Sequence, residues 1–137
     1  MDKLNGYGSV SDAIFRVLFS LIFIVGGLGH WGQHDIMMTR LEASPWLDWV
    51  LLLGDPSLLM HISGVTFLLG GVGLLLGYAT RLSALILFAT LIPITFVIHI
   101  APDHVGPLLK NVAILGGLIH FFVRGPGDYA LSSREDP

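Results

Sequence analysis

The sequence contains no cysteine and few charged residues. Only 12% of its 137 residues are Asp, Glu, Lys or Arg, and the net charge is -3. Without cysteine, this chain has no disulfide, thiolate metal site or catalytic thiol. Soluble domains carry roughly twice that share of charge, which argues against an ordinary soluble domain. Nucleic-acid-binding proteins usually have a basic surface, and the net charge of this chain is slightly negative. We therefore expect no nucleic-acid partner.

The sequence is instead rich in long apolar runs. Hydrophobic residues make up 53% of it, and the mean hydropathy is +0.77. A helix that crosses a bilayer needs about 20 mostly apolar residues. Four runs meet or approach this length, over residues 13–28, 58–78, 82–100 and 107–123. We therefore predict an all-α polytopic membrane protein in contact with the lipid bilayer. Its four-helix transmembrane domain (13–124) is flanked by an arm (1–12) and a tail (125–137).

The distribution of Lys and Arg predicts the orientation. Five of these residues fall on the side that holds both termini: Lys3, Arg16, Arg81, Arg124 and Arg134. Arg40 and Lys110 fall on the other side. Positive residues concentrate on the cytoplasmic side, so both termini are predicted to be cytoplasmic in a cell (inner) membrane. The arginines near helix ends are interpreted as membrane-edge anchors, with Asp12 and Asp128 available as ion-pair partners.

The first outer loop, residues 29–57, contains a predicted helix over residues 45–53. Ser44 suits its N-cap, Pro45 its first position, and Gly54 its end. Trp46 and Trp49 share one face, which is typical of a helix lying at the membrane interface. A lid over the bundle is the alternative interpretation.

Five of the six histidines collect at the outer level, and imidazole both titrates near neutrality and binds metals. We predict that His30, His61 and His99 converge on one cofactor-binding cavity. Lys110 and Asn111 would line its wall and could hold a quinone carbonyl, or could instead form a loop–helix latch. His30 and His34, four residues apart, are the candidate metal pair. The sixth histidine, His120, is expected to face protein with a hydrogen-bond partner.

Small residues and one proline indicate how the helices pack. Gly73 and Gly77 lie four residues apart and are expected to let two helices approach closely. Pro93 removes one backbone hydrogen bond and predicts a kink in the third span. None of the four runs contains an acidic residue, so a carboxylate proton relay within the bilayer is not expected.

Several stretches together resemble the DoxX family. They are Arg16 at the start of the first span, "SGVTFLLGGVGLLLGYATRLSAL", His99, "KNVAILGGL" and "GPGDYALS", within residues 13–132. The resemblance implies a small four-helix integral membrane protein linked to membrane redox chemistry. One branch of the family is a subunit of a thiosulfate:quinone oxidoreductase. Another belongs to a membrane oxidoreductase complex with superoxide dismutase and a sulfurtransferase.

The resemblance implies a function for the chain, and the sequence departs from the family at one position that matters for it. We expect a membrane-embedded subunit of a quinone-linked redox complex, with a non-catalytic scaffold subunit of a larger membrane complex as the alternative. Quinone is the first candidate cofactor, and haem and copper are the others. Expected protein partners are further membrane subunits or a second copy of the chain. Many members carry a glutamate where this chain has Phe67. A mechanism that needs this carboxylate is therefore in doubt, and no catalytic residue is assigned.

Overall fold

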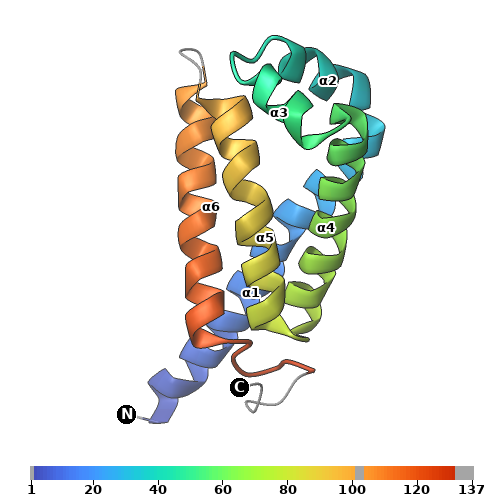
Figure 1. Cartoon of the computed structure of the whole chain (residues 1–137). Helices are drawn as coiled ribbons and strands as arrows, with labels where there is room; N and C mark the ends of the chain where they lie inside the picture. The colour runs from blue at the N-terminus through green and yellow to red at the C-terminus, as the bar shows by residue number, and fades with distance from the viewer. Residues whose placement is uncertain (1, 101–103, 132–137) are drawn as a thin grey trace.

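The computed structural model describes residues 2–100 and 104–131, which form a bundle of long helices (Figure 1). Four of these helices are long and apolar enough to cross a membrane, in agreement with the predicted fold class. They are α1 (Asp2–Gly32), α4 (Pro56–Leu76), α5 (Thr80–Ile94) with its π-helical continuation η1 (Thr95–His99), and α6 (Val105–Arg124).

The two ends of the bundle are covered by different segments of the chain. Two short helices, α2 (His34–Glu42) and α3 (Leu47–Leu53), lie across one end, which we call the loop end (Figure 1). The start of α1, the turn after α4 and residues 125–131 lie at the opposite end, which we call the terminal end. Helix α1 packs mainly on α4, and α5 lies between α4 and α6.

The boundaries of helix α4 are set by the residues at its two ends. The Asp55 carboxylate accepts a hydrogen bond from the Leu58 amide at 3.0 Å, and Pro56 occupies the first helical position. At the other end Gly77 has φ of +66°, a left-handed conformation that glycine adopts without steric cost. These residues fix a span of 21 residues.

Close packing of α1 on α4 depends on glycine. A Cβ atom on Gly27 would lie 2.9 Å from the Gly64 carbonyl oxygen. A Cβ atom on Gly64 would lie 2.8 Å from the Cβ of His30. Lipid provides no hydrophobic drive for helix association, so such close contacts supply the attraction between the two helices.

Helix α1 packs on α6 through aromatic rings instead. The Phe121 ring lies 5.1 Å from that of Phe15 and 5.4 Å from that of Phe19, measured between centroids. Phe19 and Phe121 belong to the buried apolar core, which also includes Leu74, Leu87 and Leu118. The rings fill the space between α1 and α6, and the Phe19 ring lies against Gly117, where a Cβ atom would clash with it.

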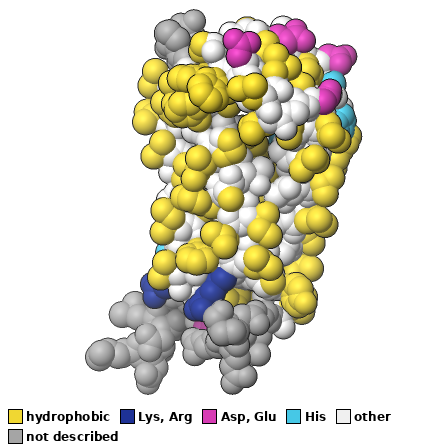
Figure 2. Space-filling model, viewed as in Figure 1, with side chains coloured by type: hydrophobic (Ala, Val, Ile, Leu, Met, Phe, Trp, Pro, Cys, Tyr) yellow, Lys and Arg dark blue, Asp and Glu magenta, His cyan; other side chains and the backbone are white. Residues whose placement is uncertain are grey.

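The sides of the bundle are covered with exposed apolar side chains (Figure 2). Leu69 on α4 and Val123 on α6 are 70% and 65% exposed, for example. In the view of Figure 2, acidic side chains gather at the loop end and Lys or Arg side chains at the terminal end. Soluble monomers rarely expose apolar patches of this extent. The chain is a multi-pass protein whose apolar sides face the lipid bilayer.

The short helix in the first loop is confirmed, although it starts later than predicted. Helix α3 begins at Leu47, because the Ser44 hydroxyl donates to the Val97 carbonyl at 2.5 Å while its oxygen accepts from the Trp46 amide at 3.2 Å. Trp46 packs on Phe96 of η1, with ring centroids 4.5 Å apart, whereas Trp49 is 65% exposed. No apolar run in the first loop predicts α2.

Two further features differ in detail from the sequence analysis. Helix α1 begins at Asp2, so residues 2–12 of the predicted arm (1–12) are helical. Helix α5 runs through Pro93, and the irregular part follows it as the π-helical turn η1. A π-helical turn carries one more residue per hydrogen-bonded ring than an α-helical turn.

Candidate functional site

The five histidines predicted for the outer level all lie at the loop end, but their rings form separate groups. Ring contacts join His34 to His61 and His99 to His104, whereas His30 contacts Phe67. Among the described residues, no ring contact joins His30, His61 and His99 to one another. Their convergence on one cavity therefore stays a prediction.

His34 and His61 are both held by Ser57. The two rings stack with centroids 5.1 Å apart, and the Nε2 of His34 lies 2.8 Å from the Ser57 hydroxyl. The Nδ1 of His61 lies 2.7 Å from the Ser57 carbonyl oxygen, which can only accept, so this Nδ1 donates. A neutral His61 therefore presents Nε2 as an acceptor. The Nδ1 of His34 lies 3.3 Å from an Asp35 carboxylate oxygen, so both nitrogens of His34 are occupied.

His30 is buried and, like His61, forms a hydrogen bond to a carbonyl of its own helix. Its Nδ1 donates to the Gly26 carbonyl at 2.8 Å, which leaves Nε2 as an acceptor in the neutral ring. Its ring meets Phe67 edge-on, at 5.4 Å between centroids and 85° between planes. Phe67 stands where the family resemblance implies a glutamate, so His30 contacts an aromatic ring here.

The candidate metal pair His30 and His34 offers one free imidazole nitrogen, the Nε2 of His30. Within residues 2–100 and 104–131, no three His, Asp or Glu side chains are close enough to share a metal ion. Metal sites in proteins typically use three or more protein ligands. The metal site at His30 and His34 stays a prediction.

His99 differs from the other histidines at the loop end. Its Nδ1 is buried and has no hydrogen-bond partner among the described residues. The neighbouring His104 ring lies 6.0 Å away, and its own Nδ1 donates to the Ile98 carbonyl at 3.0 Å. His104, Lys110 and Arg40 are the charged or titratable groups that act on His99 electrostatically. Since no carbonyl fixes its tautomer, His99 can donate a hydrogen bond from either nitrogen.

Asn111 and Lys110 have different surroundings despite being adjacent. Asn111 is 4% exposed, and its Nδ2 donates to the Thr95 hydroxyl at 3.0 Å. Thr95 in turn donates to the Leu91 carbonyl at 2.7 Å. This contact joins α6 to η1, so it links two helices, whereas the latch interpretation expects a loop and a helix. The Lys110 side chain is exposed.

At the terminal end, Arg16 has a role beyond that of the predicted membrane-edge anchor. It is 3% exposed, and its guanidinium donates to the carbonyls of Pro126 and of Asp128, the latter at 3.5 Å. The same group donates to the Tyr129 carbonyl at 2.6 Å. Backbone oxygens, rather than the expected carboxylates of Asp12 or Asp128, are therefore the acceptors. The guanidinium holds residues 126–129 against α1.

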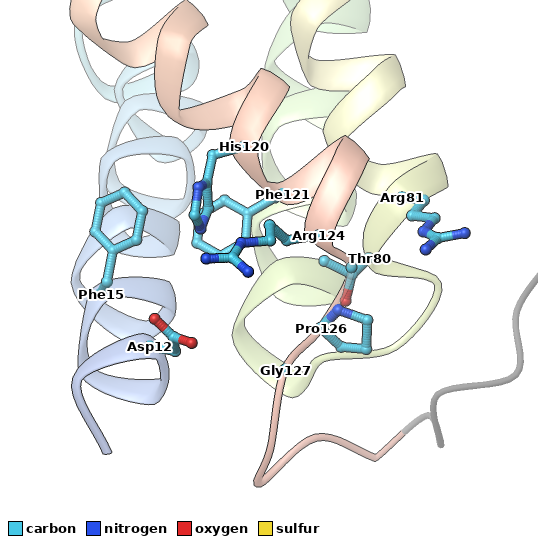
Figure 3. A pocket seen from close by; sticks show the side chains of 10 residues that line it. Asp12, Phe15, Thr80, Arg81, His120, Phe121, Arg124, Pro126 and Gly127 are labelled. Carbon is cyan, nitrogen blue, oxygen red and sulfur yellow. The ribbon is translucent and has the colours of Figure 1, made fainter. Parts of the chain in front are cut away.

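A cavity of about 170 Å³ lies at the terminal end, opposite the predicted histidine site (Figure 3). Its lining includes Asp12, Phe15, Thr80, His120, Phe121 and Arg124. The His120 ring meets Phe15 edge-on at 5.9 Å, so it faces protein as predicted. Its expected hydrogen-bond partner is not found in the described part of the chain. The spacing of four between His120 and Arg124 places them on one helix face, which is the sequence signal for this site.

Four membrane-spanning helices, with two short helices across one end, define a small polytopic membrane protein. The chain belongs to the DoxX family, which it matches over residues 11–100.

Two relatives resemble it over nearly its whole length. An uncharacterized protein of Haemophilus influenzae is 28% identical over 98% of this chain and 97% of the relative. The inner membrane protein YqjF of Escherichia coli K12 is 26% identical over 96% of this chain and 94% of the relative. No solved structure matches the chain.

Proposed function

We propose that this protein is a membrane-embedded subunit of a quinone-linked redox complex and that His99 binds the quinone headgroup. The observation that carries the proposal is the buried Nδ1 of His99, which lacks a partner among the described residues. A buried polar atom without a hydrogen bond costs about 1–3 kcal/mol and calls for an explanation. A ligand that accepts a hydrogen bond provides one.

The hydrogen-bond roles of the histidines support His99 over the other two predicted ligands. A quinone supplies carbonyl oxygens, which only accept hydrogen bonds, and it takes up two electrons and two protons on reduction. His30 and His61 already use Nδ1 as a donor, and in the neutral form they present only an acceptor. His99 retains a donor for the carbonyl.

Neighbouring groups can assist the same site. His104 carries an acceptor Nε2 beside the His99 ring and can exchange a proton with it or with water. Lys110 acts electrostatically on His99 and favours negative charge that develops on the headgroup oxygen. We assign Asn111 to helix packing, because its amide is bound to Thr95.

Binding of decylubiquinone to the purified protein in lipid nanodiscs tests this proposal. Trp46 packs on Phe96, three residues before His99, and serves as a fluorescent reporter after Trp31 and Trp49 are replaced by Phe. We expect His99→Phe to weaken binding about tenfold or more, as loss of a hydrogen bond at a buried site does. The control His61→Phe should change affinity less than about twofold, since His61 is bound within its own helix. Equal affinities for wild type and His99→Phe would contradict the quinone site and favour the scaffold alternative.

The proposed location is a bacterial inner membrane with the terminal end in the cytoplasm. The positive-inside distribution of Lys and Arg supports the orientation, and the name of the Escherichia coli relative supports the membrane. Because the chain has no cysteine, single cysteines report accessibility without background. An impermeant maleimide added to intact spheroplasts should label Leu52→Cys at the loop end and leave Gly8→Cys unlabelled. The reverse pattern would show the opposite orientation.

A further inference from the structure

The cavity at the terminal end contains a buried hydroxyl that the bundle leaves without a hydrogen bond. Thr80 is 1% exposed, lines the cavity, and its Oγ1 has no partner among the described residues. Packing alone does not require a hydroxyl at this position, because valine has the same shape. A buried, unpaired donor beside an open volume indicates a ligand that accepts a hydrogen bond.

Two further donors reach the cavity from α6. Arg124 and His120 are four residues apart on one face, and Figure 3 shows both side chains directed toward α1. Within the described residues, Arg124 forms neither an ion pair nor a hydrogen bond that would occupy its guanidinium. Arg81 also lines the cavity, but its guanidinium points away in Figure 3, so the inference does not depend on it.

The start of α5 adds a fixed positive potential. Thr80 is the first residue of this helix, and the preceding N-cap residue, Ala79, provides no side-chain hydrogen bond to the first turn. The first amides of a helix and its dipole favour a negative group at this end. Together with Arg124, they make the cavity suited to an anion with several acceptor oxygens.

We propose that this cavity binds the phosphate group of a phospholipid headgroup, with Thr80 Oγ1, Arg124 and His120 as donors. Its volume of about 170 Å³ is below the roughly 300–1,000 Å³ typical of sites for drug-sized ligands, so it suits one small polar group. Asp12 on the lining disfavours a second negative charge. The singly charged phosphodiester of a lipid is therefore favoured over dianionic free phosphate. The rings of Phe15 and Phe121 give an apolar wall beside the headgroup.

The experiment measures binding of three probes to the full-length protein in detergent by native mass spectrometry and by thermal stabilisation. The probes are phosphatidylglycerol, a galactosyl diacylglycerol without phosphate, and sodium phosphate at constant ionic strength. We expect wild type to bind phosphatidylglycerol more tightly than the phosphate-free lipid. Arg124→Gln and Thr80→Val should each weaken this binding about tenfold, while Asp12→Asn should tighten it.

Arg40→Gln is the matched control, because it removes one positive charge at the loop end. It should leave phosphatidylglycerol binding unchanged. If sodium phosphate binds in a manner that requires Thr80 and Arg124 while the lipid does not, the phosphate site stands and its ligand is a free phosphate compound. If both variants retain wild-type affinity for both phosphate probes, or if phosphate gives no advantage over the galactolipid, the proposal is wrong. Thr80→Val preserves shape and removes only an unpaired hydroxyl, so it tests the site even if another variant fails to fold.

Discussion

The two ends of the bundle use polar groups in opposite ways. At the terminal end, Arg16 binds carbonyl oxygens more than 100 positions away in the sequence. At the loop end, His30 and His61 each bind a carbonyl four positions earlier in the same helix. A long-range contact fixes how segments sit together, whereas a local one mainly orients a ring and selects its tautomer. Arg16 at the terminal end therefore contributes to the fold, whereas most histidines at the loop end leave a nitrogen available for chemistry.

Replacing Arg16 is expected to change stability more than any other substitution at either end of the bundle. Arg16→Met removes the hydrogen bonds to residues 126–129 and leaves their carbonyls without this donor. We expect a loss on the order of 3 kcal/mol in the free energy of unfolding, because hydrogen bonds to charged groups are worth about 1.5–3 kcal/mol each. Thermal unfolding in detergent measures it. Arg16→Lys keeps the charge without the planar group and should lose less. Unchanged stability in Arg16→Met would show that the terminal end does not depend on these contacts.

Gly77 gives the second effect at the same end. Its φ of +66° disfavours any side chain, and a Cβ atom would lie 2.5 Å from the Cβ of Ala130. Gly77→Ala is expected to cost about 2 kcal/mol, since the left-handed conformation alone costs about 1–2 kcal/mol. Gly116→Ala is the control, because nothing lies within 4 Å of a Cβ there. That variant should be neutral or slightly stabilising in the same unfolding assay. If Gly116→Ala lost as much stability as Gly77→Ala, the loss could not be attributed to the conformation and contacts of Gly77.

The smallest predicted loss of stability is at the loop end, where a hydrogen bond joins two helices. Asn111→Ala removes the hydrogen bond to Thr95 that joins α6 to η1. Hydrogen bonds between membrane helices average about 0.6 kcal/mol and reach about 1.7 kcal/mol, so we expect a loss in this range. A double-mutant cycle with Thr95→Val should recover a coupling energy of similar size. Zero coupling would argue that Asn111 is free to bind a ligand, which is one of the two interpretations that its position in the sequence allows.

The sequence predicts the membrane fold well because length and hydropathy alone define a span. The number of spans agrees with the structure, although α4 begins at Pro56, before the predicted start at residue 58. Helix α2 lacks a long apolar run, so the same criterion could not find it. The start of α3 depends on the contact of Ser44 with Val97, which local sequence does not show.

The sequence predicts where the histidine site lies better than it predicts which hydrogen bonds each histidine forms. Histidine positions at helix ends predict the loop end, but the acceptor that each ring finds decides which nitrogen is free. That distinction separates His99 from His30 and His61. The cavity at the terminal end is formed by α1, α5 and α6 together, so it appears only when their ends are brought into contact.

The hydrogen bonds of Arg16 also have a consequence for biosynthesis. Its acceptors follow it by 110 to 113 residues, near the end of the chain. At about 5–20 residues per second, translation takes roughly 6–22 s to supply them after Arg16 has been made. During this interval the guanidinium is inside a membrane-inserted helix without its final partners and must draw on water or lipid headgroups. Residues 126–129 therefore complete the hydrogen bonds of Arg16 only after all four spans have been made, and a chain that stops before them leaves the guanidinium without these acceptors.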